Sequence, residues 1–209
     1  MKKLYGNLKM SWLTVILFAA AAGVYTGIVM MIDALAGTSF QDIGTFYEWW
    51  VIFAVIIVVN CSKSWEAALK CFLFFLVSQP LIYAVQILFG RFTASMAWLY
   101  YRITWLPVTF LTLPGGFIAY YCKKQNLLGA VILGLGNTMQ AVMGVSYFCK
   151  VFTSFPNHLL SGIVCFASIF IMSFYIQKRK KYRLVSILLA FVLTAVIAVF
   201  AILSGLSFG

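Results

Sequence analysis

The chain carries the basic run KRKKYR at residues 178–183, followed directly at residues 184–206 by the uncharged stretch LVSILLAFVLTAVIAVFAILSGL. As a helix rising 1.5 Å per residue, this stretch would be about 34 Å long, which covers a hydrocarbon core of about 30 Å. Short loops rich in Lys and Arg are retained in the cytoplasm. The two segments together therefore predict a transmembrane helix that starts on the cytoplasmic side.

Further apolar segments of similar length occupy most of the chain, which is 64% hydrophobic and only 9% charged. Such a composition is typical of a protein that crosses a membrane several times. We expect an all-α fold, a single polytopic bundle over residues 1–209. The predicted seven transmembrane helices comprise residues 11–32, 43–61, 66–89, 103–122, 126–149, 158–177 and 184–206.

The first of these segments follows several lysines and also has features of a cleaved secretory signal. Its apolar run exceeds the roughly 7–15 residues of a signal core, which favours a retained span.

The distribution of basic residues predicts the orientation of the bundle. Of the 15 Lys and Arg residues, 12 fall in four segments on one predicted side: Lys2, Lys3, Lys9; Lys63, Lys70; Lys123, Lys124; and Lys178, Arg179, Lys180, Lys181, Arg183. The other three, Arg91, Arg102 and Lys150, fall in the alternate gaps. This bias places the N-terminus in the cytoplasm and the C-terminus outside, in a multi-pass protein of the cell (plasma) membrane.

The same basic residues indicate what the protein binds at its surface. They lie at predicted helix ends, where they meet the lipid bilayer and the anionic headgroups of its cytoplasmic face. They are not interleaved with aromatic residues for base stacking, so we expect no nucleic-acid partner.

Three small residues recur at every fourth position of the first predicted helix: Ala19, Gly23 and Gly27. Such a strip lets another helix approach closely. We expect it to serve helix packing within the chain, with a homo- or hetero-oligomer contact as the alternative.

The third predicted helix carries a polar face near its midpoint. Gln79, Tyr83 and Gln86 follow one another at spacings of four and three, and Pro80 removes a backbone donor beside them. An amide without a partner is costly in hydrocarbon, so this face is expected to point into the bundle.

The fourth and fifth predicted helices carry polar or helix-weakening residues at a matching depth. Thr112 precedes Pro114, Gly115 and Gly116, a sequence that favours a kink or break with free backbone groups. Asn137 and Gln140 lie near the centre of the fifth helix. The three helices together predict a polar site at the membrane midplane, as interrupted helices form in many transporters. The alternative is that these side chains only hold helices together.

Among the four acidic residues, Glu48 is unusual. The uncharged stretch that follows it is too short to span, so the second helix is expected to start before Glu48 and draw its carboxylate inward. We interpret it as a gate or coupling acid. The alternative is a carboxylate that lies at headgroup level or pairs with Arg91 or Arg102. Asp33 and Asp42 are expected to be outer-loop charges, and His158, the sole histidine, an exposed helix-end residue.

Enzyme motifs are absent from the sequence. There is no paired-histidine zinc motif, no Gly-x-Ser-x-Gly elbow, no phosphate loop, and the five cysteines have no metal-binding spacing. We therefore expect no enzyme, no cofactor and no metal site.

The sequence favours a small transporter or channel for a small polar or cationic solute, with its pathway bounded by the third, fourth and fifth predicted helices. One alternative is the membrane-embedded substrate-binding subunit of a multi-component vitamin or micronutrient importer. Such subunits are similar in length but commonly have six spans. Another alternative is a non-transporting accessory membrane protein that binds its partners through the small-residue strip.

Overall fold

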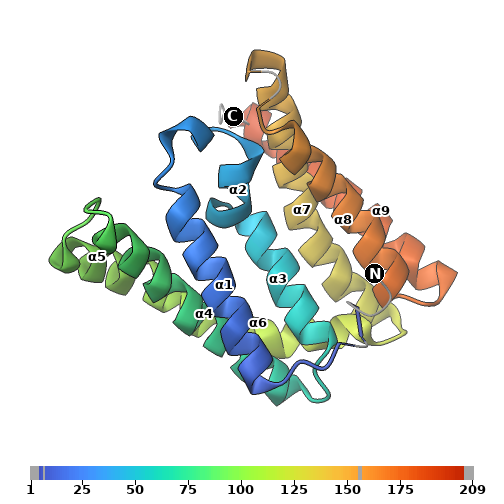
Figure 1. Ribbon diagram of the computed structural model, residues 1–209. Coiled ribbons are helices and arrows are strands. Elements are labelled where there is room, and N and C mark those ends of the chain that lie inside the picture. Colours follow the sequence, from blue (N-terminus) through green and yellow to red (C-terminus); the bar gives the residue numbers. More distant parts are fainter. Residues whose placement is uncertain (1–4, 7, 155–156, 205–209) are drawn as a thin grey trace. The chain divides into compact units, whose positions relative to one another are not determined.

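The computed structural model describes residues 5–6, 8–154 and 157–204, and this part of the chain contains helices and no strand (Figure 1). The helices are α1 (Trp12–Val29), η1 (Asp33–Leu35), α2 (Ser39–Thr45), α3 (Tyr47–Val59), α4 (Ser64–Leu88), α5 (Ala94–Tyr100), the π-helical turn η2 (Tyr101–Trp105), α6 (Leu106–Ala119), η3 (Tyr120–Lys123), α7 (Leu127–Ser154), α8 (Leu159–Ile176) and α9 (Lys180–Leu203).

Six helical stretches are long and apolar enough to cross a membrane, which indicates a multi-pass membrane protein. They correspond to the first and third to seventh predicted spans, and the end of the predicted span 184–206 lies outside the described residues. A seventh span results only if α2 and α3, which are bent by 57°, are counted as one. By itself α3 has 13 residues and is about 20 Å long, too short for a hydrocarbon core of about 30 Å.

Two helical stretches extend beyond the spans that the sequence predicted. The predicted span 103–122 belongs to a continuous helical stretch from Ala94 to Lys123, which starts at the N-cap Thr93, whose hydroxyl accepts from the Met96 N–H at 3.4 Å. The predicted span 184–206 begins earlier, because α9 incorporates basic residues from Lys180 onward. Charge alone does not end a helix, since Lys and Arg are good helix formers.

The helices form two compact units. Among the described residues, the first consists of those between 5 and 36 together with Ile43–Tyr120, and the second consists of Gly37–Asp42 together with those between 121 and 204. The chain therefore passes from one unit to the other within α2, and again after Tyr120.

In the first unit, α1 packs closely on α4 through the predicted small-residue strip. A Cβ atom added to Gly23 would lie 2.5 Å from the carbonyl oxygen of Ser78, and one added to Gly27 would lie 2.6 Å from the Cβ of Val85. Ala19 is fully buried on the same face. The strip is thus occupied by a helix of the same chain.

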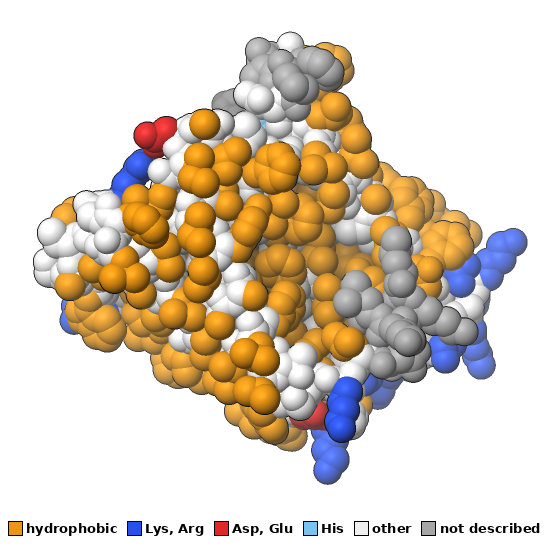
Figure 2. Space-filling model, in the orientation of Figure 1, with side chains coloured by type: hydrophobic (Ala, Val, Ile, Leu, Met, Phe, Trp, Pro, Cys, Tyr) orange, Lys and Arg blue, Asp and Glu red, His pale blue; other side chains and the backbone are white. Residues whose placement is uncertain are grey.

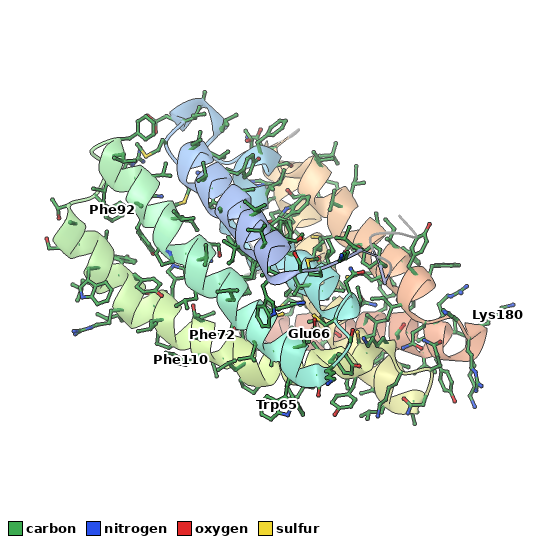
Figure 3. The ribbon with its side chains drawn as sticks, turned by 60° about the horizontal axis from the view of Figure 1, so that its bottom comes forward. Trp65, Glu66, Phe72, Phe92, Phe110 and Lys180 are labelled. Carbon is green, nitrogen blue, oxygen red and sulfur yellow. The ribbon has the colours of Figure 1, made fainter. Side chains whose placement is uncertain are left out.

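Helix α6 packs on the other side of α4. Gly116 allows this approach, since an added Cβ would lie 3.1 Å from the Cα of Ala68. Phe72 of α4 and Phe110 of α6 face each other with ring centroids 5.5 Å apart (Figure 3). Trp65 makes a similar contact with Phe117, at 5.0 Å.

The sequence favoured a kink or a break at Pro114, Gly115 and Gly116. The break is wrong, because α6 continues through all three residues, and the kink stays a prediction. The irregular turn lies earlier, in the π-helical segment η2 just before Pro107. A proline ring clashes with the carbonyl group four residues before it, and a wider turn is one way to relieve the clash. Of the two prolines, Pro107 follows a π-helical turn, whereas Pro114 lies within regular α-helix.

The second unit is formed mainly by α7, α8 and α9. Gly134 of α7 lies against α9, and Gly144 lies against α8, where an added Cβ would be 2.8 Å from the ring of Phe166. Two glutamines hold the loops: the amide nitrogen of Gln125 donates to the Ile176 carbonyl at 2.8 Å, and that of Gln177 donates to the Cys122 carbonyl at 2.6 Å.

The surface is suited to lipid. Hydrophobic side chains cover most of the visible face, and Lys and Arg side chains lie at its margins (Figure 2). Beyond its basic first turn, α9 exposes large apolar side chains, among them Leu188, Val192 and Val196. Lys180, at the start of α9, projects away from the helices (Figure 3).

Candidate functional sites

Glu48 lies directly after the bend between α2 and α3. It is in the first turn of α3, as the sequence predicted, and its side chain is completely buried. The bend is fixed by Gly44, whose carbonyl accepts from the hydroxyl of Thr26 and from the indole N–H of Trp50, both at 3.2 Å. A negative charge in the first turn of a helix is favourable. The depth of this carboxylate in the membrane, and with it the choice between a gate or coupling acid and a headgroup-level charge, stays a prediction.

The predicted ion pair between Glu48 and Arg91 is replaced by another. Arg91 instead contacts Asp33 at 3.3 Å, and both side chains are largely exposed. Such an exposed pair contributes little to stability.

An aromatic cluster attaches α3 to α4 near Glu48. The ring of Trp50 lies 5.8 Å from that of Phe74 and 5.6 Å from that of Phe75. One helical turn farther along α4 are Ser78 and Gln79, so α3 is held against the part of α4 that precedes its polar face.

The polar face of α4 is buried where the sequence predicted it. Gln79 and Gln86 have almost no exposed surface, and Tyr83 is half-buried between them. The Gln86 amide nitrogen donates to the sulfur of Met30 at 3.2 Å, a weak acceptor. Neither amide atom of Gln79, nor the hydroxyl of Ser78, has a hydrogen-bond partner among the described residues. This is the least satisfied polar group in the described part of the first unit.

The three candidate residues of α6 have different surroundings. The Thr112 hydroxyl donates to the Thr109 carbonyl of its own helix at 2.6 Å. Gly116 is a packing residue against α4, and Gly115 is exposed, with no atom within 4 Å of an added Cβ. Because Pro114 lies inside the continuous helix α6 and has no N–H, the carbonyl of Phe110 lacks its usual helical donor.

In the second unit, Asn137 and Gln140 connect α7 to α8. The Asn137 amide nitrogen donates to the Ser173 hydroxyl at 2.9 Å, and that hydroxyl also contacts Ser186 of α9 at 3.1 Å. The amide oxygen of Gln140 accepts from Ser168 at 3.3 Å. The Asn137 amide oxygen is buried without a partner among the described residues. Asn137 thus has both a packing role and unused hydrogen-bonding capacity.

The predicted midplane site combines residues of both units. Gln79, Tyr83, Gln86, Thr112, Gly115 and Gly116 belong to the first unit, and Asn137 and Gln140 belong to the second. A pathway bounded by all three predicted helices therefore stays a prediction.

A buried cluster that the sequence did not predict lies in the second unit. Asp42 and His158 were expected at exposed positions, and this was wrong. The Asp42 side chain is completely buried and that of His158 is 12% exposed, with 2.8 Å between Asp42 Oδ2 and His158 Nδ1. The Ser161 hydroxyl donates to the same oxygen at 2.6 Å. The two partners are 116 residues apart, and no local pattern connects them.

This cluster does not have the order of a hydrolase site. The Ser161 hydroxyl donates to the carboxylate of Asp42 and not to the imidazole, whereas a serine nucleophile needs a general base as its neighbour. Metal binding has little support either, since the described residues contain no group of three His, Cys, Asp or Glu side chains suited to a metal ion.

Comparisons with known proteins do not extend these assignments. No model of a known protein family, no curated protein and no solved structure matches this chain.

Proposed function

We propose that this protein is a small integral transporter or channel of the cell membrane for a small polar solute, neutral or cationic. The observation that carries the proposal is the side chain of Gln79. It is completely buried and has no hydrogen-bond partner among the described residues. An unbonded buried amide costs about 1–3 kcal/mol, so its retention is explained best by a polar solute or water that meets it.

Two further observations support the proposal. Glu48 places a buried carboxylate beside a bent pair of helices, and ionisable groups within spans commonly serve transport. The strip of Ala19, Gly23 and Gly27 packs on α4, which leaves it covered and argues against an accessory protein that docks through this face.

The topology belongs to the same proposal. With the N-terminus in the cytoplasm, the basic segments face anionic headgroups on the inner leaflet. The six long spans also keep the substrate-binding subunit of a vitamin or micronutrient importer as the second candidate. The two differ in one respect: a self-sufficient transporter moves solute without other subunits.

The test is solute uptake by lipid vesicles that contain only the purified protein. Urea and glycerol serve as neutral probes and choline as a cationic probe. We expect at least one of them to enter faster than into protein-free vesicles, and Gln79→Leu to abolish the difference. Gln177→Leu is the matched control, because Gln177 is also a fully buried glutamine but its amide nitrogen already donates to the Cys122 carbonyl.

Two results would count against the proposal. Equal entry of all three probes with and without protein would favour the importer subunit or an accessory protein. Unchanged uptake by Gln79→Leu would remove the residue from the pathway.

A further inference from the structure

The contact between Asp42 and His158 ties the first half of α2 to the start of α8. His158 is the N-cap residue of α8, and its backbone has φ = 65°, in the left-handed region that residues other than glycine rarely adopt. A second connection lies beside it, where the Ser161 N–H donates to the Ser39 hydroxyl at 3.1 Å. The imidazole is therefore held in place by unusual backbone geometry and by its neighbours.

The carboxylate of Asp42 is only partly satisfied. Its Oδ2 atom accepts a hydrogen bond from the Ser161 hydroxyl and lies within hydrogen-bond distance of His158 Nδ1. Its Oδ1 atom is buried without a partner among the described residues. A buried negative charge is costly unless a positive charge compensates it. Protonation of His158 would supply that compensation at 2.8 Å.

A tyrosine of α7 contacts the pair. On α7, the ring of Tyr147 stacks on the imidazole with centroids 5.5 Å apart, and Lys150 follows three positions later, on the same side of the helix. Helix α9 has no titratable side chain after Arg183, and Asp42 is the only one in α2. Asp42 is thus the acidic group in contact with His158.

We propose that Asp42 and His158 form a proton-binding site. Histidine is the side chain that ordinarily changes charge between about pH 5 and 8. Proton uptake converts a neutral imidazole beside a buried carboxylate into an ion pair, and so strengthens the attachment of α2 to α8. The site stands on this geometry alone; the use of its proton to drive solute movement rests on the function proposed above.

The test uses the fact that the chain contains one histidine. Protein labelled with ¹⁵N-histidine gives a single imidazole signal, whose titration is followed by NMR in detergent micelles. We expect the signal to titrate between about pH 5 and 8. Asp42→Asn should move its midpoint to lower pH, because the negative charge that favours the imidazolium is lost.

Two variants separate this effect from a general disturbance of the fold. Asp33→Asn makes the same change at an exposed carboxylate that contacts Arg91, and should leave the midpoint unchanged. Ser161→Ala should raise the midpoint, because the carboxylate loses a hydroxyl donor and its charge acts more fully on the imidazolium. If Asp42→Asn fails to fold, the direction in which Ser161→Ala moves the midpoint still tests the proposal.

Three outcomes would overturn the proton site: an imidazole that does not titrate between about pH 5 and 8, the same midpoint in Asp42→Asn as in the unchanged protein, or a midpoint lowered by Ser161→Ala. None of them depends on solute uptake. A proton site confirmed by NMR in a protein that moves no solute would contradict the proposed function and leave the site in place.

Discussion

Replacement of Gln79 by Leu tests whether the buried amide of α4 meets a solute or another helix. Both amide atoms lack a hydrogen-bond partner among the described residues. The substitution therefore removes an unbonded polar group, whose burial costs about 1–3 kcal/mol, and leaves a side chain of similar volume. We expect the free energy of unfolding to stay unchanged or to increase by up to this amount.

Gln177→Leu gives the opposite expectation for the same chemical change. The amide nitrogen of Gln177 donates to the carbonyls of Cys122 at 2.6 Å and Lys124 at 3.2 Å. Hydrogen bonds between helices of membrane proteins average about 0.6 kcal/mol, so the loss of two should cost about 1.2 kcal/mol. The amide oxygen of Gln177, like both amide atoms of Gln79, is buried without a partner among the described residues, so the two variants differ in the donor bonds lost. We therefore expect Gln79→Leu to be the more stable of the two.

The measurement is reversible unfolding of each purified variant in mixed detergent micelles, monitored by circular dichroism. Solute uptake by vesicles is measured on the same preparations, because a Gln79 amide that meets the solute requires the Gln79→Leu variant to be stable but inactive in uptake. The reasoning is refuted if Gln79→Leu is less stable than Gln177→Leu, since the amide would then be bonded within the folded protein.

Three more predictions concern packing, charge and topology. Gly23→Ala should destabilise the protein by about 1–3 kcal/mol, because the added Cβ would lie 2.5 Å from the Ser78 carbonyl oxygen. Gly115→Ala is the control and should leave the free energy of unfolding unchanged, because no atom lies within 4 Å of its added Cβ. Equal unfolding free energies of the two variants would contradict the close packing of α1 on α4. Glu48→Gln should preserve the circular dichroism spectrum and change solute uptake or its pH dependence, and unchanged uptake from pH 5 to 8 would reduce Glu48 to a structural residue. A cysteine placed at position 95 should react with a membrane-impermeant reagent from outside while one at position 125 should not, and the reverse pattern would invert the topology.

The sequence was most informative where structure depends on local composition. A long apolar segment must satisfy its backbone within itself, so helices such as α1, α4 and α8 lie close to their predicted ranges. The burial of Gln79 and Gln86 followed from their spacing on one face of a helix.

Features that depend on neighbouring turns or distant partners were predicted less well. Pro107 and Pro114 both lie in the helical stretch from Ala94 to Lys123, yet only Pro107 lies beside a π-helical turn, although the glycines follow Pro114. The bend between α2 and α3 depends on Thr26, which is 18 residues away from Gly44. Such contacts leave no periodic pattern in the sequence.

The placement of Gly37–Asp42 in the second unit has a consequence for biosynthesis. Asp42 leaves the ribosome 116 residues before His158. At 5–20 residues per second, this interval lasts about 6–23 s. During that time the carboxylate of Asp42 has neither of its hydrogen-bond donors from α8, and it must remain in water or among headgroups. The first half of α2 therefore reaches its final place only after α8 has been made, which sets a late step in the maturation of the protein.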